Sequence, residues 1–263
     1  MQTDHKEEKT IKSTRTAFDI IEVIAARDRP SITEIADAVD CSRSTVHYHL
    51  RTLQRDNYVI RGEGGLRLGL RMARLGNVAL RKHRLTGVVE QTTDDLAAET
   101  DAVAHVAVEE GNNLVWLYKS TPGTRDDCPT EVGEAVDLHC TAYGQAILAH
   151  VPADVLETVV AGSGLREVTE QTLTSRATLE ERLSTIRQLG FAYSPEEYRP
   201  GLSSIAAPIF DGRDEVVGSI GITDTQSRID DPYKHPKARR FSDELPGHVQ
   251  KAARIVSDHV AEL

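Results

Sequence analysis

The residues with the clearest chemistry lie between positions 42 and 67, where arginine, hydroxyl and aromatic side chains are concentrated. Guanidinium groups form bidentate hydrogen bonds with guanine O6 and N7, and both guanidinium and hydroxyl groups bind phosphate. This combination predicts contact with double-stranded DNA. The predicted DNA-binding residues are Ser42, Arg43, Ser44, Thr45, His47, Tyr48, Arg51, Arg61 and Arg67.

A helix over the first part of this region would give its residues distinct roles. Arg43 and His47 are one helical turn apart and would face base edges together. Ser44 and Thr45 suit phosphates or thymine methyl groups. A discrimination of about 1–3 kcal/mol is typical of one good bidentate contact to a base.

The flanking residues suggest how these side chains are positioned. Ser31 and Glu34 form an S-x-x-E capping box, which predicts the start of a short helix, and Ser42 can cap the next. Two short runs, 59–60 and 67–68, flank a glycine-rich tip and predict a β-hairpin. Helix, turn, helix and hairpin in this order predict a winged helix-turn-helix, whose second helix enters the major groove.

Within this module, the residues beyond the base-reading turn should hold the DNA backbone. Tyr48 and Arg51 lie on the same helix and are expected to contact phosphates. Arg61 and Arg67, on the two arms of the hairpin, are expected to reach phosphates or the minor groove.

Charge is distributed unevenly along the 263 residues, whose net charge is −10. Residues 1–85 hold 16 Lys or Arg and 11 Asp or Glu, whereas residues 86–263 hold 15 and 30. Within residues 41–84 there are ten basic side chains and two acidic ones. A basic module favours phosphate binding, and an acidic remainder would confine DNA contact to one end.

Two other functions could account for the residues of the basic module. An amphipathic helical hairpin used for dimer contact would need no basic hairpin. His47 and His49 could bind a metal, but side chains two positions apart diverge on a helix.

After a predicted linker helix over residues 72–85, the apolar spacing indicates an α/β arrangement. Helices are expected near 88–99, 141–150, 153–161, 178–189 and 242–261. Strands are expected near 103–108, 113–119, 191–194, 204–210 and 215–223.

Several classes are disfavoured by composition. No apolar run is long enough to span a bilayer, and the first residues lack the apolar core of a secretory signal, so we expect a cytoplasmic protein with no membrane contact. Cys41, Cys128 and Cys140 form no C-x-x-C pair. We therefore expect no disulfide framework, no metal site and no cofactor.

Enzymatic interpretations are also weak. Ser203, Ser204, His139 and Cys140 could suggest a hydrolase, but there is no G-x-S-x-G motif and an adjacent His-Cys pair does not create a nucleophile and its base. Zinc held by His139, Cys140 or Cys128 lacks a recognisable ligand spacing. We expect a protein that is not an enzyme.

Several segments together resemble the IclR family of transcriptional regulators. They are SRSTVHYHLRTL followed by GLRLGLR, then LHCTAYGQAILA, TLTSRATLEERLSTIRQLGFAYSPEEYRPGLSSIAAPIFD and VVGSIGIT, in that order. The resemblance implies an α+β protein with an N-terminal winged helix-turn-helix and a C-terminal GAF-like effector-binding domain. The acidic composition and the preference for Arg over Lys would suit a salt-adapted organism such as a haloarchaeon.

The resulting domain prediction has four parts. They are a disordered tail (1–10), the winged helix-turn-helix (11–71), the linker helix (72–85) and the GAF-like domain (86–263). The resemblance further implies a homodimer or a dimer of dimers that binds promoter DNA as a repressor or an activator.

The resemblance also implies a small-molecule effector, such as an organic acid, a sugar derivative or an amino-acid-related metabolite. Its predicted site comprises Ala142, Tyr143, Ser194, Ser204, Gly221 and Thr223. Backbone amides at the first two positions would bind an acidic group, as amides at a helix start do elsewhere. The alternative is a C-terminal domain that serves only for oligomerisation.

Overall fold

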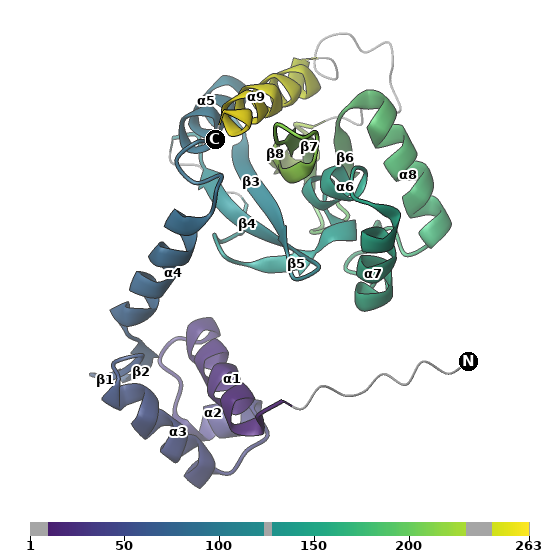
Figure 1. Cartoon of the computed structure of the whole chain (residues 1–263). Helices are drawn as coiled ribbons and strands as arrows, with labels where there is room; N and C mark the ends of the chain where they lie inside the picture. The colour runs from purple at the N-terminus through teal and green to yellow at the C-terminus, as the bar shows by residue number, and fades with distance from the viewer. Residues whose placement is uncertain (1–9, 124–127, 230–243, 263) are drawn as a thin grey trace. The chain divides into compact units, whose positions relative to one another are not determined.

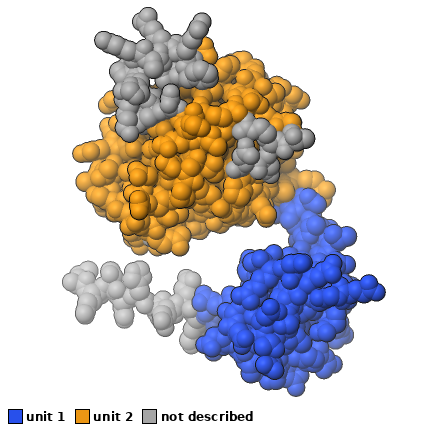
Figure 2. All heavy atoms as spheres, turned by 180° about the vertical axis from the view of Figure 1, so that it is seen from behind, with its two compact units in different colours: residues 1–79 blue, residues 80–263 orange. Residues whose placement is uncertain are grey.

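The computed structural model describes residues 10–123, 128–229 and 244–262. The chain divides into two compact units, residues 1–79 and 80–263, which Figure 2 distinguishes by colour. The predicted disordered tail, residues 1–10, lies outside the described residues except for Thr10.

Unit 1 is a winged helix-turn-helix, as predicted (Figure 1). Its elements are α1 (Lys12–Ala26), α2 (Ile32–Ala38), α3 (Arg43–Arg55), β1 (Val59–Gly62) and β2 (Gly65–Leu68). Its core is formed by apolar side chains from all five elements, namely Ile20, Ile24, Ile35, Ala36, Val46, Leu50, Val59 and Leu66. One side chain from each strand, Val59 and Leu66, closes this core, so the hairpin is packed against the helices.

Helix starts in unit 1 follow the capping residues seen in the sequence. The Ser31 hydroxyl accepts from the Glu34 amide (3.2 Å), and the Glu34 carboxylate accepts from the Ser31 amide (2.8 Å). These bonds hold the pKa of Glu34 below its usual value. Ser42 accepts from the Thr45 amide at 3.1 Å and so caps α3. The two predicted caps are confirmed.

The hairpin tip requires glycine. Gly62 pairs with Gly65 at the end of the antiparallel ladder, and Gly65 has a φ of +143°. A Cβ atom on Gly65 would lie 2.6 Å from the backbone oxygen of Arg29, which is too close for any side chain. The tip can therefore approach the α1–α2 loop, where the Arg29 guanidinium donates to the Glu63 carbonyl at 2.9 Å.

The linker helix α4 runs over Leu70–Lys82, so it begins and ends earlier than the predicted 72–85. Local hydrogen bonds explain why this helix ends at Lys82. The Leu80 carbonyl accepts from the His83 amide (3.0 Å) and from the Thr86 hydroxyl (2.6 Å). Those bonds occupy the acceptor that a continuing helix would need, and turns follow until α5.

Unit 2 is built on one six-stranded sheet in the order β5-β4-β3-β8-β7-β6, with every neighbouring pair antiparallel. The strands are β3 (Val103–Glu110), β4 (Asn113–Ser120), β5 (Ala135–Asp137), β6 (Ala192–Pro195), β7 (Leu202–Phe210) and β8 (Val216–Thr225). The short edge strand β5 was not predicted, whereas the other five were.

Helices cover both faces of this sheet (Figure 1). They are α5 (Glu90–Thr100), α6 (Ala142–Leu148), α7 (Ala153–Ser163), α8 (Arg176–Leu189) and α9 (Glu244–Ala261). α5 and α9 pack on one face, over Ile220 and Ile222, whereas α6, α7 and α8 pack on the other, over Trp116 and Ala206. Because side chains alternate along β8, Gly221 and Thr223 face the second layer, as predicted.

Candidate nucleic-acid interface and effector cavity

The outer face of α3 carries most of the predicted DNA-binding side chains. Val46 and Leu50 point into the core of unit 1. Apart from half-buried Thr45, the predicted residues of this helix and its cap are exposed, namely Ser42, Arg43, Ser44, His47, Tyr48 and Arg51. Tyr48 is 68% exposed, which is unusual for a large aromatic ring.

The hydroxyl groups at the start of α3 have partners of their own. Ser42 shares hydrogen bonds with the side chains of Ser44 (2.8 Å) and Thr45 (2.9 Å). A hydroxyl can donate and accept at once, so Ser44 and Thr45 can still bond a phosphate while they order the cap. DNA contact by these three residues remains a prediction.

Four arginines of α3 and the hairpin have no carboxylate partner among the described residues. Within the described part of the chain, Arg43, Arg51, Arg61 and Arg67 take part in no ion pair, and all four are exposed. Arg67 only donates to the carbonyl of Leu68 on its own strand (3.2 Å). Guanidinium groups without carboxylate partners can neutralise phosphates without first breaking an ion pair.

Not every basic residue of unit 1 is available in this way. Arg71, at the start of α4, donates to the Asp56 carbonyl at 2.8 Å, and its guanidinium lies 4.6 Å from the centre of the Tyr58 ring. This side chain ties α4 to the end of α3. We therefore assign Arg71 a structural role.

In unit 2, three of the predicted effector residues line one small cavity. Ser194, Ser204 and Thr223 come from β6, β7 and β8, and the hydroxyls of the last two lie 2.9 Å apart. The antiparallel register pairs Ser204 with both Ser194 and Thr223, which brings residues distant in sequence together. The cavity contains about 330 Å³ of space, of which only about 10 Å³ admits the centre of a water molecule.

The other three predicted effector residues do not line this cavity. Tyr143 is fully buried, and its hydroxyl lies 3.3 Å from both Thr223 Oγ1 and His105 Nδ1. Burial raises the pKa of the Tyr143 phenol well above its usual value, so it stays protonated. Ala142 is also fully buried. A role for either residue's backbone amide in ligand binding remains a prediction.

Gly221 has a packing role in this chain. A Cβ atom at this position would lie 2.2 Å from the backbone oxygen of Ile205 and 2.7 Å from the Cα of Ala206. Glycine therefore permits the close approach of β7 and β8 beneath the cavity. Contact between Gly221 and a ligand remains a prediction.

A buried imidazole lies next to the cavity. His105 Nε2 lies 2.7 Å from the Thr130 hydroxyl, and the ring lies 4.9 Å from that of Trp116. Burial, helped by the charge of Lys119, lowers the pKa of His105 to about 3. The imidazole is therefore neutral, and it links Thr130 to Tyr143.

Sequence reasoning missed several lining residues, namely Trp116, Cys128, Thr130, Thr141, Tyr198, Arg199 and Leu202. Trp116 could have been predicted, because it is the single tryptophan and its strand was predicted. Arg199 and Tyr198 follow the P-E-E segment in a connection between β6 and β7. Nothing in their local pattern indicates that they turn toward a cavity.

A buried ion pair holds the connection between β6 and β7 in place. Glu197 is 1% exposed and accepts from the Arg182 guanidinium (3.1 Å) and from the Gln145 amide. Burial raises the pKa of Glu197 to about 7, in spite of the opposing effects of Arg182 and these hydrogen bonds. The backbone carbonyl of Glu197 also accepts from Thr172 at 2.7 Å. Residues 198 and 199 are therefore held by their neighbour to α6 and α8.

The residues considered for catalysis or zinc are engaged in structural contacts. Cys140 donates to the Asp137 carbonyl (3.1 Å), and burial, with a contribution from Asp137, raises the pKa of its thiol to about 12. His139 Nε2 lies 3.0 Å from the Arg166 carbonyl oxygen. Across residues 10–123, 128–229 and 244–262, no three His, Cys, Asp or Glu side chains are grouped to hold a metal ion.

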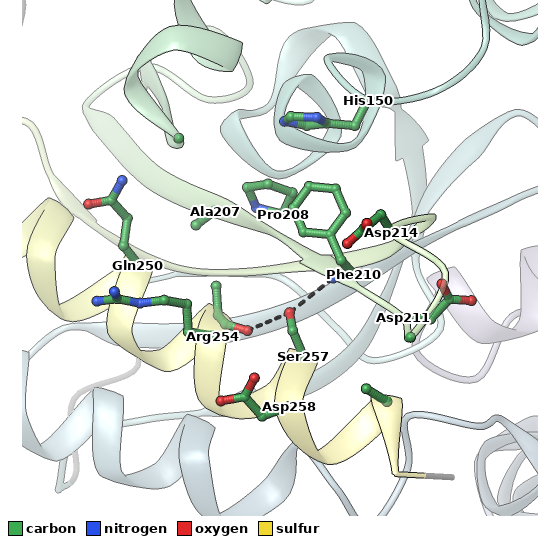
Figure 3. A pocket seen from close by; sticks show the side chains of 14 residues that line it. His150, Ala207, Pro208, Phe210, Asp211, Asp214, Gln250, Arg254, Ser257 and Asp258 are labelled. Atoms are coloured by element: carbon green, nitrogen blue, oxygen red, sulfur yellow. Dashed lines mark hydrogen bonds between the residues drawn. The ribbon is translucent and has the colours of Figure 1, made fainter.

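A larger, open groove, in which about 550 Å³ admits the centre of a water molecule, lies elsewhere in unit 2 (Figure 3). His150 packs edge-on over Phe210 (5.0 Å) on one side, and Arg254 and Ser257 of α9 form the other. Ser257 accepts from the Phe210 amide (3.0 Å) and donates to the Ala253 carbonyl (2.8 Å). The groove contains none of the predicted effector residues, and opposite charges mix along its open walls. We therefore take the smaller cavity as the candidate effector site.

Comparison with known proteins agrees with both units. Residues 13–62 match the IclR helix-turn-helix domain, and residues 77–258 match the family model described as bacterial transcriptional regulator IclR C-terminal. The described helices include none that is long and apolar enough to cross a membrane.

Related proteins of known or inferred role align with most of the chain. A probable HTH-type transcriptional regulator, ArcR, from Halobacterium salinarum is 27% identical over 95% of this chain and 94% of its own length. A glycerol operon regulatory protein from Streptomyces griseus is 30% identical over 84% of this chain and 87% of its own length.

Among solved structures, an IclR homologue from Microbacterium hydrocarbonoxydans complexed with 4-hydroxybenzoate has the same fold. It superposes with a TM-score of 0.77 at 19% identity, covering 96% of this chain and all of that one. With the winged helix-turn-helix, the six-stranded sheet covered by helices on both faces and both family models in agreement, the chain belongs to the IclR family of transcriptional regulators.

Proposed function

We propose that this DNA-binding regulator controls transcription in the cytoplasm by releasing or engaging promoter DNA when a small metabolite occupies unit 2. The protein acts by binding rather than by catalysis. Unit 1 contacts the duplex through the exposed face of α3 and through the hairpin, and the cavity near Ser204 and Thr223 binds the effector.

The observation that carries the DNA-binding part is that all four arginines predicted to bind DNA, Arg43, Arg51, Arg61 and Arg67, are exposed and take part in no ion pair with a described residue. The two on the hairpin lie on opposite strands, with Arg61 paired to Leu66 and Arg67 to Ile60. Because side chains alternate along each strand, this register places the two arginines on opposite faces of the hairpin, so they can reach the DNA backbone from two sides of it.

We propose further that the protein acts as a homodimer or a dimer of dimers. Unit 1 leaves large apolar side chains uncovered on α1 and α4 and at their starts, namely Ile11 (71% exposed), Phe18 (63%), Leu70 (84%) and Leu75 (41%). A second copy of the chain would cover them. Exchange of Phe18 and Leu70 for serine should then halve the mass found by sedimentation, from dimer to monomer or from dimer of dimers to dimer, whereas an unchanged mass would contradict this assignment.

The DNA-binding assignment is tested with Arg43→Ala in fluorescence anisotropy, using duplexes from the DNA upstream of the protein's own and neighbouring genes. We expect specific affinity to fall by roughly tenfold or more, because one bidentate base contact is removed. Arg254→Ala, an equal loss of charge at an exposed position of α9, serves as the control and should bind as the wild type does. Equal affinity of all three proteins would contradict the assignment.

A unit 2 that serves only for oligomerisation is the competing function. It predicts that no metabolite changes either the melting temperature of unit 2 or the DNA affinity. The presence of buried polar atoms without partners around the cavity favours effector binding instead, since such atoms are costly when nothing bonds to them.

A further inference from the structure

The chain that leaves α4 is anchored to the sheet of unit 2 by a buried leucine. Leu85 is fully buried and belongs to the core that α5 and α9 form on the sheet. A Cβ atom on Gly218 of β8 would lie 3.1 Å from Leu85 Cδ1, so glycine at this position leaves room for the leucine against β8. Because α4 crosses the boundary between the two units, Leu85 fixes the unit 2 end of the linker.

Between the end of α4 and this anchor, the chain forms a turn that is closed by its own hydrogen bonds. The Leu80 carbonyl accepts from the His83 amide and from the Thr86 hydroxyl. His83 Nδ1 in turn accepts from the Leu85 amide at 3.3 Å. The turn is therefore ordered, and it carries the side chain of Arg84, which is 54% exposed.

An ion pair joins this turn to the turn between β7 and β8. Arg84 Nη1 lies 3.4 Å from Asp211 Oδ2, although the two residues are 127 positions apart in sequence. Asp211 Oδ1 accepts from the amides of Arg213 (2.9 Å) and Glu215 (3.1 Å). The bond from the Arg213 amide, with contributions from Glu215 and Arg84, holds the pKa of Asp211 below its usual value. The carboxylate is thus ionised and fixed to its own turn, and Arg84 is the more exposed partner.

The strands on either side of Asp211 are the same two that carry Ser204 and Thr223. Those two residues are paired in the β7–β8 ladder. Ser204 precedes Asp211 by seven residues, or about 24 Å along a strand. The ladder runs unbroken from Ser204 to Ile209 and changes register only between Ile209 and Phe210, next to the turn. A paired strand is a rigid element, so a shift of β7 or β8 can be carried to Asp211.

We propose that the Arg84–Asp211 ion pair positions the end of α4 and thereby makes promoter affinity depend on the state of unit 2. Leu85 is the fixed point, and the ion pair sets how the preceding turn leaves the sheet. This inference rests on the proposed control of DNA binding by unit 2 and identifies the residues that transmit it. Arg84 and Asp211 are positioning residues, and neither lines the candidate effector cavity. An exposed ion pair suits this role because it forms and breaks at little cost.

Promoter affinity tests the ion pair without any effector. Full-length Arg84→Gln, Asp211→Asn and the double variant are titrated at low salt with the duplex that the wild type binds most tightly. Asparagine keeps a side-chain oxygen for the two turn amides, so the turn should stay folded. Both single variants should shift the affinity in the same direction by about twofold to fivefold, the range that an exposed ion pair contributes. The double variant should shift it no further, because either change alone already breaks the pair.

A general effect of charge on DNA binding would give a different pattern. Loss of the positive charge of Arg84 would weaken binding, and loss of the negative charge of Asp211 would strengthen it, so the shifts would be opposite. Arg213→Gln is the matched control, because its exposed side chain lies in the same turn without an ion pair among the described residues. It should bind as the wild type does. Urea unfolding followed by Trp116 emission verifies that unit 2 of each variant is folded.

Four outcomes would overturn the inference: wild-type affinity in both single variants, shifts in opposite directions, additive shifts in the double variant, or the same shift in Arg213→Gln. They are distinct from failure of the proposed function. If the wild type binds the duplex and the variants show one of these outcomes, DNA binding stands and only the role of the ion pair fails. If the wild type binds no duplex, the proposed function fails and this inference fails with it.

Discussion

Acidification should weaken unit 2 through His105, which is buried beside the effector cavity. Its pKa is lowered from 6.5 to about 3 in the folded protein, so the unfolded chain binds a proton over this interval and the folded chain does not. The stabilising effect is therefore present above pH 6.5 and is lost as the pH falls. Between about pH 7.5 and 5.5, this one group should lower the free energy of unfolding by about 1.4 kcal/mol.

The assay is urea unfolding followed by Trp116 emission, which reports on unit 2 alone. Other groups titrate in the same interval, so the useful quantity is the difference between the wild type and His105→Phe at each pH. That difference should change by about 1.4 kcal/mol between the two conditions, in favour of the variant at the lower pH. His47→Phe, a replacement in unit 1, controls for the substitution itself.

A difference that stays constant with pH would refute the reasoning, because it would mean that His105 gains its proton in the folded state. A change of opposite sign would place a negative charge beside the ring where the structure has Lys119. Either result would also mean that the hydrogen-bonded chain from Thr130 through His105 to Tyr143 is not neutral.

Three further predictions concern the supports of the two sites. Glu197 has a pKa raised to about 7, so the free energy of unfolding should fall as the pH rises from about 4.5 to 7, by up to about 3 kcal/mol, and Glu197→Gln should flatten this dependence in urea titrations. Gly144→Ala would place a Cβ atom 2.0 Å from the Leu138 carbonyl oxygen and should lower the melting temperature of unit 2, whereas Gly162→Ala, with open space around it, should raise stability by about 0.5–1 kcal/mol. Gly65→Ala should destabilise unit 1 and reduce DNA affinity without changing the unfolding of unit 2, and a wild-type melting profile for unit 1 would contradict the role given to the hairpin tip.

Local signals were sufficient for most of unit 1. The capping residues Ser31 and Ser42 act within three positions of themselves, and the hairpin is set by adjacent glycines, so short-range reasoning found both helix starts and the two strands. The end of α4 was placed too late. The Thr86 hydroxyl that bonds the Leu80 carbonyl is specified by a turn, which leaves no periodic pattern in the sequence.

The residues that line the cavity of unit 2 could be predicted only in part. Ser204 and Thr223 were found because family motifs cover their strands, and the observed register brings their hydroxyls together. Trp116 and Arg199 were missed because they reach the cavity through strand order and through a connection whose course depends on the buried Arg182–Glu197 pair. Strand β5 was missed because three residues at a sheet edge carry too short a pattern.

The central claim, that unpaired arginines of unit 1 hold the duplex, is tested most directly by the salt dependence of promoter affinity. If Arg51, Arg61 and Arg67 each neutralise one phosphate, the plot of log affinity against log salt should have a slope of about −2.7 for each protomer, and Arg61→Gln should reduce its magnitude by about 0.9 for each protomer. Affinity that does not change with salt, or a slope that Arg61→Gln leaves as it was, would contradict the account.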